Sequence, residues 1–147
     1  MKVLIDADGC PVVDIAIAAC SRFHIPCLLL CDTAHQMLRQ GAQTLVFDKG
    51  SDSVDFALVN RVEAGDLVIT QDYGLASMCL ARKARVLHQD GWEYTDYNIQ
   101  ALLFQRAESR KYRAGGGRIK GPAKRKPEQD SAFRQAIDQL LQQSVQG

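Results

Sequence analysis

Carboxylates follow two apolar segments of this chain at the points where those segments end. Asp6 and Asp8 come directly after the apolar residues 3–5, and Asp72 comes shortly after residues 67–70. Carboxylates this close repel one another and are costly to bury, so hydrogen bonds or a cation must offset the cost. Oxygen ligands suit Mg²⁺ or Mn²⁺, which can activate water and stabilise charge on a phosphoryl group. The pattern predicts a metal site suited to hydrolysis of a phosphodiester.

A further pair of acids, Asp52 and Asp55, stands at the start of a segment with helical spacing. If the apolar segments are parallel strands, their carboxyl ends and this helix start meet at one edge of a sheet. We therefore expect these acids to approach those that follow the strands. The predicted metal ligands are Asp6, Asp8, Asp52 and Asp72.

Most of these carboxylates also have a structural interpretation. Asp52 and Asp55 could favour a helix N-terminus through its dipole, and Asp72 and Asp8 could cap the helices that follow them. Asp6 ends an apolar segment and has no helix to cap. The metal interpretation therefore depends most on Asp6.

The elements that must position these side chains alternate between short apolar runs and helical patterns over the first ninety residues. Alternation of this kind, with strands apolar on both faces, is typical of a parallel sheet covered by helices on both sides. We predict a single-domain, three-layer α/β/α fold with a mostly parallel central sheet. The expected strands are 3–5, 27–31, 44–47, 67–70 and 85–87, and the expected helices are 11–23, 33–40, 51–62, 73–82, 95–110 and a last one from Asp130.

Charge is distributed unevenly along the chain. Residues 106–127 contain nine Lys or Arg and one Glu, whereas the whole chain has a net charge of +1. We expect an α/β domain over residues 1–110, a basic loop with glycine and proline over 111–129, and a C-terminal helix over 130–147 that packs on or extends the same domain. Such a loop could bind nucleic acid, RNA above all, or serve as a solubilising linker. The predicted nucleic-acid-binding residues are Arg118, Lys120, Lys124, Arg125 and Lys126.

Composition excludes several classes of protein. No apolar run approaches the roughly 20 residues of a membrane span, and early acids interrupt any signal-peptide core, so a cytoplasmic protein without a membrane partner is expected. The five cysteines include no C-x-x-C pair, which favours reduced thiols over disulfides or zinc. Cys10, near a predicted helix start, is either a stabilised thiolate or a small residue in a tight turn. The chain is compatible with a homodimer.

Four motifs carry a resemblance to a known family. They are IDADGCP at 5–11, GDLVITQDYGLA at 65–76, GWEYT at 91–95, and GP followed by QDSAF near the end. The chain resembles the uncharacterised bacterial YaiI/YqxD family, which is placed among PIN-like proteins, often Mg²⁺- or Mn²⁺-dependent ribonucleases. The resemblance implies a PIN-like fold and a metal-dependent ribonuclease site, with Asp6, Asp72 and Asp52 or Asp55 in the catalytic positions; we assign Asp6, Asp72 and Asp55.

Two other functions fit the same residues. The fold could serve as a non-catalytic nucleic-acid-binding or regulatory module. The DADG segment also resembles the start of haloacid-dehalogenase-type phosphatases, in which Asp6 would be the nucleophile and Thr70 would bind phosphate. That family needs a late acidic pair after another strand, which this chain lacks after Leu87.

Overall fold

The computed structural model describes residues 1–33, 36–49, 53–117 and 123–146. Within these residues the strands form one six-stranded sheet in the order β3-β2-β1-β4-β5-β6. All neighbouring strands pair in parallel except β5 and β6, which are antiparallel. The strands are β1 (Val3–Asp6), β2 (Cys27–Asp32), β3 (Gln43–Phe47), β4 (Leu67–Ile69), β5 (Arg85–Leu87) and β6 (Glu93–Tyr94).

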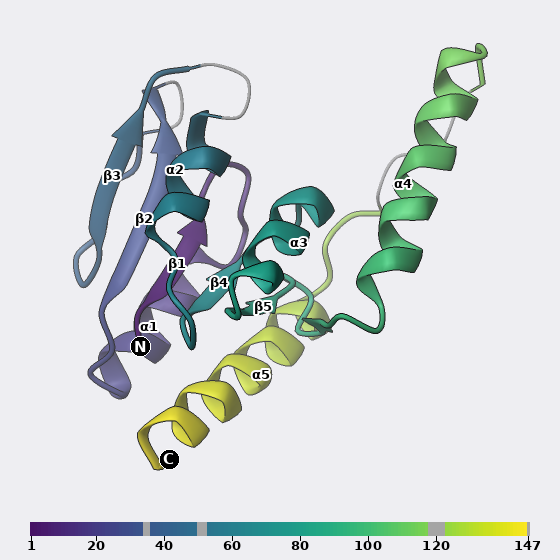
Figure 1. The fold of residues 1–147 in the computed structure, drawn as a ribbon. Helices are drawn as coiled ribbons and strands as arrows, with labels where there is room; N and C mark the ends of the chain where they lie inside the picture. Colours follow the sequence, from purple (N-terminus) through teal and green to yellow (C-terminus); the bar gives the residue numbers. More distant parts are fainter. Residues whose placement is uncertain (34–35, 50–52, 118–122, 147) are drawn as a thin grey trace.

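Helices cover both faces of this sheet, which confirms the predicted α/β fold (Figure 1). Alternate residues of β1 show the two layers: Val3 and Ile5 pack with α1 and α5, whereas Leu4 packs with α2 and α3. Burial of β1, β2 and β4 on both faces explains why these strands read as continuous apolar runs rather than as alternating patterns. The helices are α1 (Val13–Arg22), α2 (Ser53–Arg61), α3 (Tyr73–Ala81), α4 (Ile99–Ala114) and α5 (Pro127–Gln146).

The strand order reverses between β1 and β4, which are the two central strands. The strands β2 and β3 lie on the β1 side of this pair, and the strands β5 and β6 lie on the β4 side. In doubly wound sheets the carboxyl ends of the strands at such a switch border a crevice. Asp6 ends β1 and Asp72 follows β4, so the sequence places its carboxylates at this crevice.

Helix boundaries differ from the predictions at several points. The helix expected over residues 33–40 is wrong for 36–40, which form no helix, and residues 34–35 lie outside the described residues. The helix expected to end at Arg110 runs to Ala114, because Lys, Tyr, Arg and Ala continue it until the glycines begin. The last helix begins at Pro127 rather than Asp130, since proline is well suited to the first helical position.

The C-terminal helix α5 is fastened to the body through the turn after β5. Gly91 in that turn has φ +92°, and a Cβ added there would lie 2.7 Å from the backbone carbon and oxygen of Ala132. Phe133, Ile137 and Leu141 of α5 are buried in the same core layer as α1. This helix therefore belongs to the domain core. Among the described residues, no helix has the length and apolar character needed to cross a membrane.

Candidate functional site

Asp6 stands at the carboxyl end of β1, and its side chain is largely withdrawn from water. The hydroxyl of Thr70 donates a hydrogen bond of 2.8 Å to Asp6 Oδ2. Burial is the main cause that raises the pKa of Asp6 from 3.8 to about 6, although the Thr70 hydrogen bond opposes this shift. The carboxylates of Asp55, Asp72 and Asp8 add to the increase. Three of the other predicted site acids are therefore close enough to Asp6 to raise its pKa.

Asp72 has both a structural and an electrostatic role. Its Oδ1 accepts a hydrogen bond from the backbone N–H of Leu75 at 3.0 Å, so it caps α3 as the structural interpretation expects. The same oxygen lies 3.4 Å from Nη1 of Arg106 on α4. The Thr70 hydroxyl accepts the Asp72 backbone N–H while donating to Asp6, so one side chain connects the two acids. The single hydroxyl hydrogen of Thr70 is thus used within the protein.

The remaining predicted acids lie around this pair. Asp8 accepts hydrogen bonds from the backbone N–H of Asp32 at 3.2 and 3.4 Å, which fixes the β1 loop against the end of β2. The N-cap position of the first helix is taken by Val12, which makes no side-chain cap hydrogen bond. Asp55 lies in the first turn of α2, and Asp52 lies outside the described residues.

The described residues hold few clustered side chains that could ligate a metal. No group of three or more His, Cys, Asp or Glu side chains there is arranged to hold an ion. A closed cage of protein ligands, as Ca²⁺ or Zn²⁺ requires, is therefore not formed by these residues. Mg²⁺ commonly keeps several waters and uses only one or two carboxylates, and Asp6 with Asp72 fits that smaller requirement.

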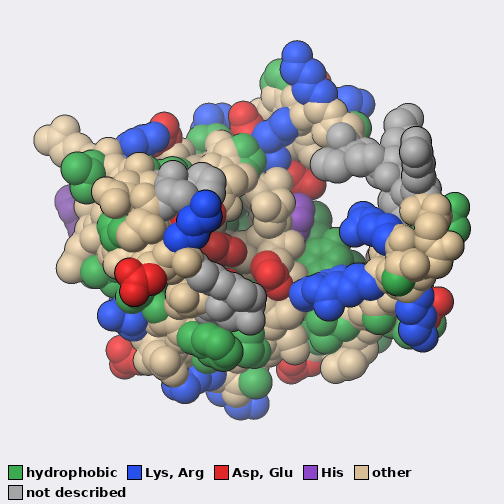
Figure 2. Space-filling view, turned by 90° about the horizontal axis from the view of Figure 1, so that it is seen from above, with side chains coloured by type: hydrophobic (Ala, Val, Ile, Leu, Met, Phe, Trp, Pro, Cys, Tyr) green, Lys and Arg blue, Asp and Glu red, His purple; other side chains and the backbone are tan. Residues whose placement is uncertain are grey.

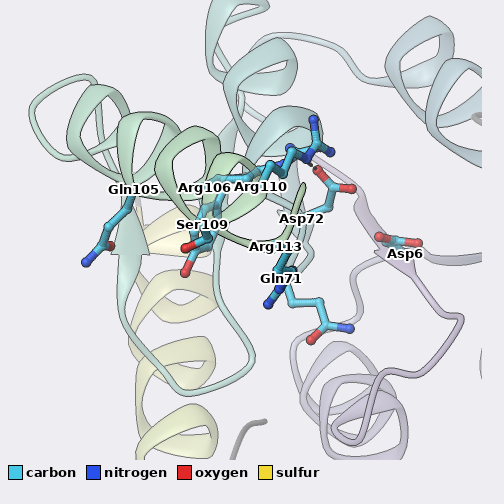
Figure 3. Close-up of a pocket in the computed structure, with 9 residues that line it drawn as sticks. Asp6, Gln71, Asp72, Gln105, Arg106, Ser109, Arg110 and Arg113 are labelled. Atoms are coloured by element: carbon cyan, nitrogen blue, oxygen red, sulfur yellow. Dashed lines mark hydrogen bonds and ion pairs between the residues drawn. The ribbon is translucent and has the colours of Figure 1, made fainter. Parts of the chain in front are cut away.

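A cleft of about 600 Å³ opens beside these acids, between the sheet edge and α4 (Figure 3). We call it the arginine cleft. In Figure 3, side chains of α4 reach toward Asp72, and a dashed line marks the contact between Arg106 and Asp72. Figure 2 shows Lys and Arg side chains on the α4 side facing Asp and Glu side chains across a hollow. The cleft is lined by Asp6, Gln71, Asp72 and Tyr73 on the sheet side and by Gln105, Arg106, Ser109, Arg110 and Arg113 on α4.

The arginines of this cleft are the functional candidates that the sequence interpretation missed. Arg106, Arg110 and Arg113 recur at intervals of four and three residues, which places them on one helix face. They belong to the basic segment noted in the sequence, but the predicted binding residues were assigned further along it. The helical spacing was the available signal. Because the helix was expected to end at Arg110, Arg113 was not placed on the same helix face.

The predicted nucleic-acid-binding residues occupy a different place. Arg125 donates to Asp130 Oδ1, Asp90 Oδ1 and the backbone oxygen of Gln89, at 2.7 to 2.8 Å, so its guanidinium joins α5 to the turn after β5. Lys124 and Lys126 are exposed, while Arg118 and Lys120 lie outside the described residues.

Cys10 follows the tight turn after Asp8, and it is partly buried. Burial raises the pKa of the Cys10 thiol to about 11, so the neutral thiol is favoured. This agrees with a small residue that fills a turn and not with a stabilised thiolate. All five cysteines are free thiols, as the sequence predicts.

The fold and cleft define a doubly wound α/β domain with an acidic sheet edge opposite a cationic helix. Residues 4–143 match the family described as uncharacterized BCR, YaiI/YqxD (DUF188). The chain belongs to this family, as the resemblance implied. It is 49% identical to a UPF0178 protein of Exiguobacterium sibiricum over 96% of each chain. A UPF0178 protein of Ruminiclostridium cellulolyticum is 42% identical over all of this chain and 96% of its own. One of Enterococcus faecalis is 38% identical over 99% and 100% respectively.

Proposed function

We propose that this protein hydrolyses phosphodiester bonds, most naturally those of RNA, with Mg²⁺ or Mn²⁺ at the acidic sheet edge. The observation that carries the proposal is the arginine cleft, which has Asp6 and Asp72 on one wall and three arginines on the other. A phosphodiester bound there would meet guanidinium donors on one side and carboxylates on the other. The arrangement agrees with the PIN-like resemblance, in which Asp6, Asp55 and Asp72 hold the catalytic positions.

The residues have separable roles in this proposal. Asp6 and Asp72 would hold the cation, with Asp8 and Asp55 adding negative charge nearby. When bound, the ion would supply a polarised water and neutralise charge on the phosphoryl oxygens. Arg106 would exchange its contact with Asp72 for a non-bridging phosphate oxygen, because guanidinium groups bind phosphate strongly. Thr70 would hold the Asp6 carboxylate in orientation.

The titration of Asp6 gives this activity a pH dependence. With a pKa of about 6, the carboxylate is protonated in part below that pH and cannot then ligate a cation. Metal affinity and cleavage should both rise as pH increases through 6. A bound cation would itself lower this pKa, so the midpoint should move down as Mn²⁺ concentration is raised.

Calorimetric titration with Mn²⁺, paired with a cleavage assay on single-stranded and structured RNA, tests the proposal. Wild type should bind Mn²⁺ and cleave RNA, and EDTA should abolish cleavage. Asp6→Asn should weaken Mn²⁺ binding at least tenfold, whereas Asp96→Asn, an exposed acid before α4, should leave it unchanged. A wild-type protein that binds no Mn²⁺ would overturn the metal site. Binding of RNA without cleavage would instead support a non-catalytic nucleic-acid-binding module.

A further inference from the structure

A second cavity, of about 250 Å³, adjoins the arginine cleft at Asp72 and Arg106, which line both. Its remaining walls come from α2 and α3, with Phe56 and Met78 as the largest apolar side chains. We call it the Phe56 cavity. The ion pair of Asp72 and Arg106 therefore lies between a strongly charged cleft and a hollow of mixed lining, in which Asp55 accompanies the apolar side chains.

Phe56 is one of several aromatic side chains that are open to solvent, and it differs from Phe104 in lining a cavity. Phe56 is 60% exposed and Met78 is 37% exposed, while Leu75 beneath them is buried. An aromatic face and a polarizable thioether, both open to solvent, form a surface on which a flat ring can stack. Every nucleobase presents such a ring, so stacking here would not depend on sequence.

The arginine face of α4 complements a chain of evenly spaced negative charges. Ile99 and Leu102 pack toward the body in the first turns, and the same helix face continues as Arg106, Arg110 and Arg113 over the cleft. At a rise of 1.5 Å per residue, Arg106 and Arg113 are about 10 Å apart along the helix axis. Within the described parts of the chain, neither Arg110 nor Arg113 has an ion-pair partner. They are therefore available to successive phosphates.

We propose that the two hollows together bind a single-stranded polynucleotide, with its phosphates along the α4 arginines and one unpaired base in the Phe56 cavity. This inference rests on the proposed function, because it assigns the substrate class of the same site. Bases in a duplex are paired and stacked between neighbours, so they must leave the stack before they can enter such a cavity. The site consequently selects single strands over duplexes.

Fluorescence anisotropy with a labelled RNA of about 12 nucleotides, within the usual range of single-strand site sizes, tests this proposal. The buffer contains EDTA, so binding is measured without any metal. The same strand is compared with its annealed duplex, with a DNA strand of equal sequence, and with a strand made abasic throughout. The DNA arm shows whether the ribose hydroxyl adds to recognition by phosphate and base.

Single strands should bind at least tenfold more tightly than the duplex. Phe56→Ala should weaken binding of base-containing strands by about fivefold or more, which corresponds to loss of one stacked base, and should not affect the abasic strand. Phe104→Ala removes a comparably exposed aromatic side chain that lines neither hollow, so it should leave both affinities unchanged. Because Phe56 is exposed, its variant should keep the wild-type melting temperature.

Replacing both Arg110 and Arg113 by alanine should reduce the slope of log affinity against log salt by about 1.4, or 0.7 for each lost phosphate contact. Arg134→Ala, on the exposed face of α5, should not change the slope. Equal binding of duplex and single strand, or an equal effect of Phe56→Ala on the abasic strand, would overturn the inference. These outcomes do not depend on Mn²⁺ or cleavage, so the proposed function can fail while this binding mode stands, and the reverse also holds.

Discussion

Asp6 should make this protein less stable at neutral pH than it would be with a neutral side chain. Its folded-state pKa is about 6, against 3.8 for an ordinary aspartate, mainly because of burial. Between these two values the native protein binds more protons than the unfolded chain, so stability falls as pH rises through this window. The shift of about 2 pKa units corresponds to roughly 3 kcal/mol once Asp6 is fully ionised, at 1.36 kcal/mol per unit.

Asp6→Asn removes this cost while preserving most local contacts. The amide oxygen can still accept the Thr70 hydroxyl, and the amide hydrogens would face neighbouring carboxylates. In EDTA at pH 7.5 the variant should be more stable than wild type by up to about 3 kcal/mol. At about 2 to 4 °C per kcal/mol for a chain of this size, the full effect would raise its melting temperature by roughly 6 to 12 °C.

Urea denaturation at pH values from 3.5 to 8 measures the effect directly. The difference between variant and wild type should be smallest near pH 3.5, grow through pH 4 to 6 and level off above pH 7. Asp96→Asn makes the same chemical change at an exposed position and controls for net charge. A constant difference across this range, or a variant less stable than wild type at pH 7.5, would refute the assigned cause.

Three further substitutions test contacts that hold the domain together. Asp66→Asn should destabilise the fold by about 2 to 4 kcal/mol, because Asp66 is buried and loses its ion pair with the partly buried Lys2, whose Nζ lies 2.7 Å from Asp66 Oδ2. Burial by itself would raise the pKa of Asp66, but the hydrogen bonds from Lys2 and from backbone N–H groups outweigh it and lower the pKa. The stabilisation by Asp66 should therefore be lost as wild type is acidified through the carboxylate range. Gly91→Ala should cost about 2 kcal/mol or more, since the new Cβ meets the Ala132 backbone at a left-handed φ. Arg125→Ala should cost about 1 to 3 kcal/mol through loss of two carboxylate contacts and one carbonyl contact.

Urea denaturation at pH 7 measures all three, and each has a distinct contrary result. If the difference in stability between wild type and Asp66→Asn stays constant on acidification, the ion pair is not its source. Gly91→Ala with unchanged hydrogen exchange in α5 would show that this turn does not fasten the helix. Arg125→Ala with unchanged stability but weaker RNA binding would favour the nucleic-acid role predicted for this residue over the structural one.

The sequence predicted the sheet and its carboxylates because both depend on local pattern. Apolar runs such as residues 27–31 and 67–70 predict strands that are buried on two faces, and these runs coincide with β2 and β4. The expected helix over 33–40 failed, and the two-residue strand β6 was not foreseen. Such short segments contain too few residues for a periodic pattern, so contacts with the rest of the fold decide their conformation.

By itself, the sequence determined that Asp6 and Asp72 would reach the same sheet edge, because parallel strands direct their carboxyl ends alike. Tertiary structure decided what stands opposite them. The packing of α4 opposite the sheet edge sets three arginines over the acids, and its extension past Arg110 adds the last of them, Arg113. The packing of α2 beside α3 leaves Phe56 open next to Asp72. Neither arrangement is local, since Phe56 and Asp72 are 16 positions apart and Asp72 and Arg106 are 34 apart, and the packing of helices on a common sheet must bring them together.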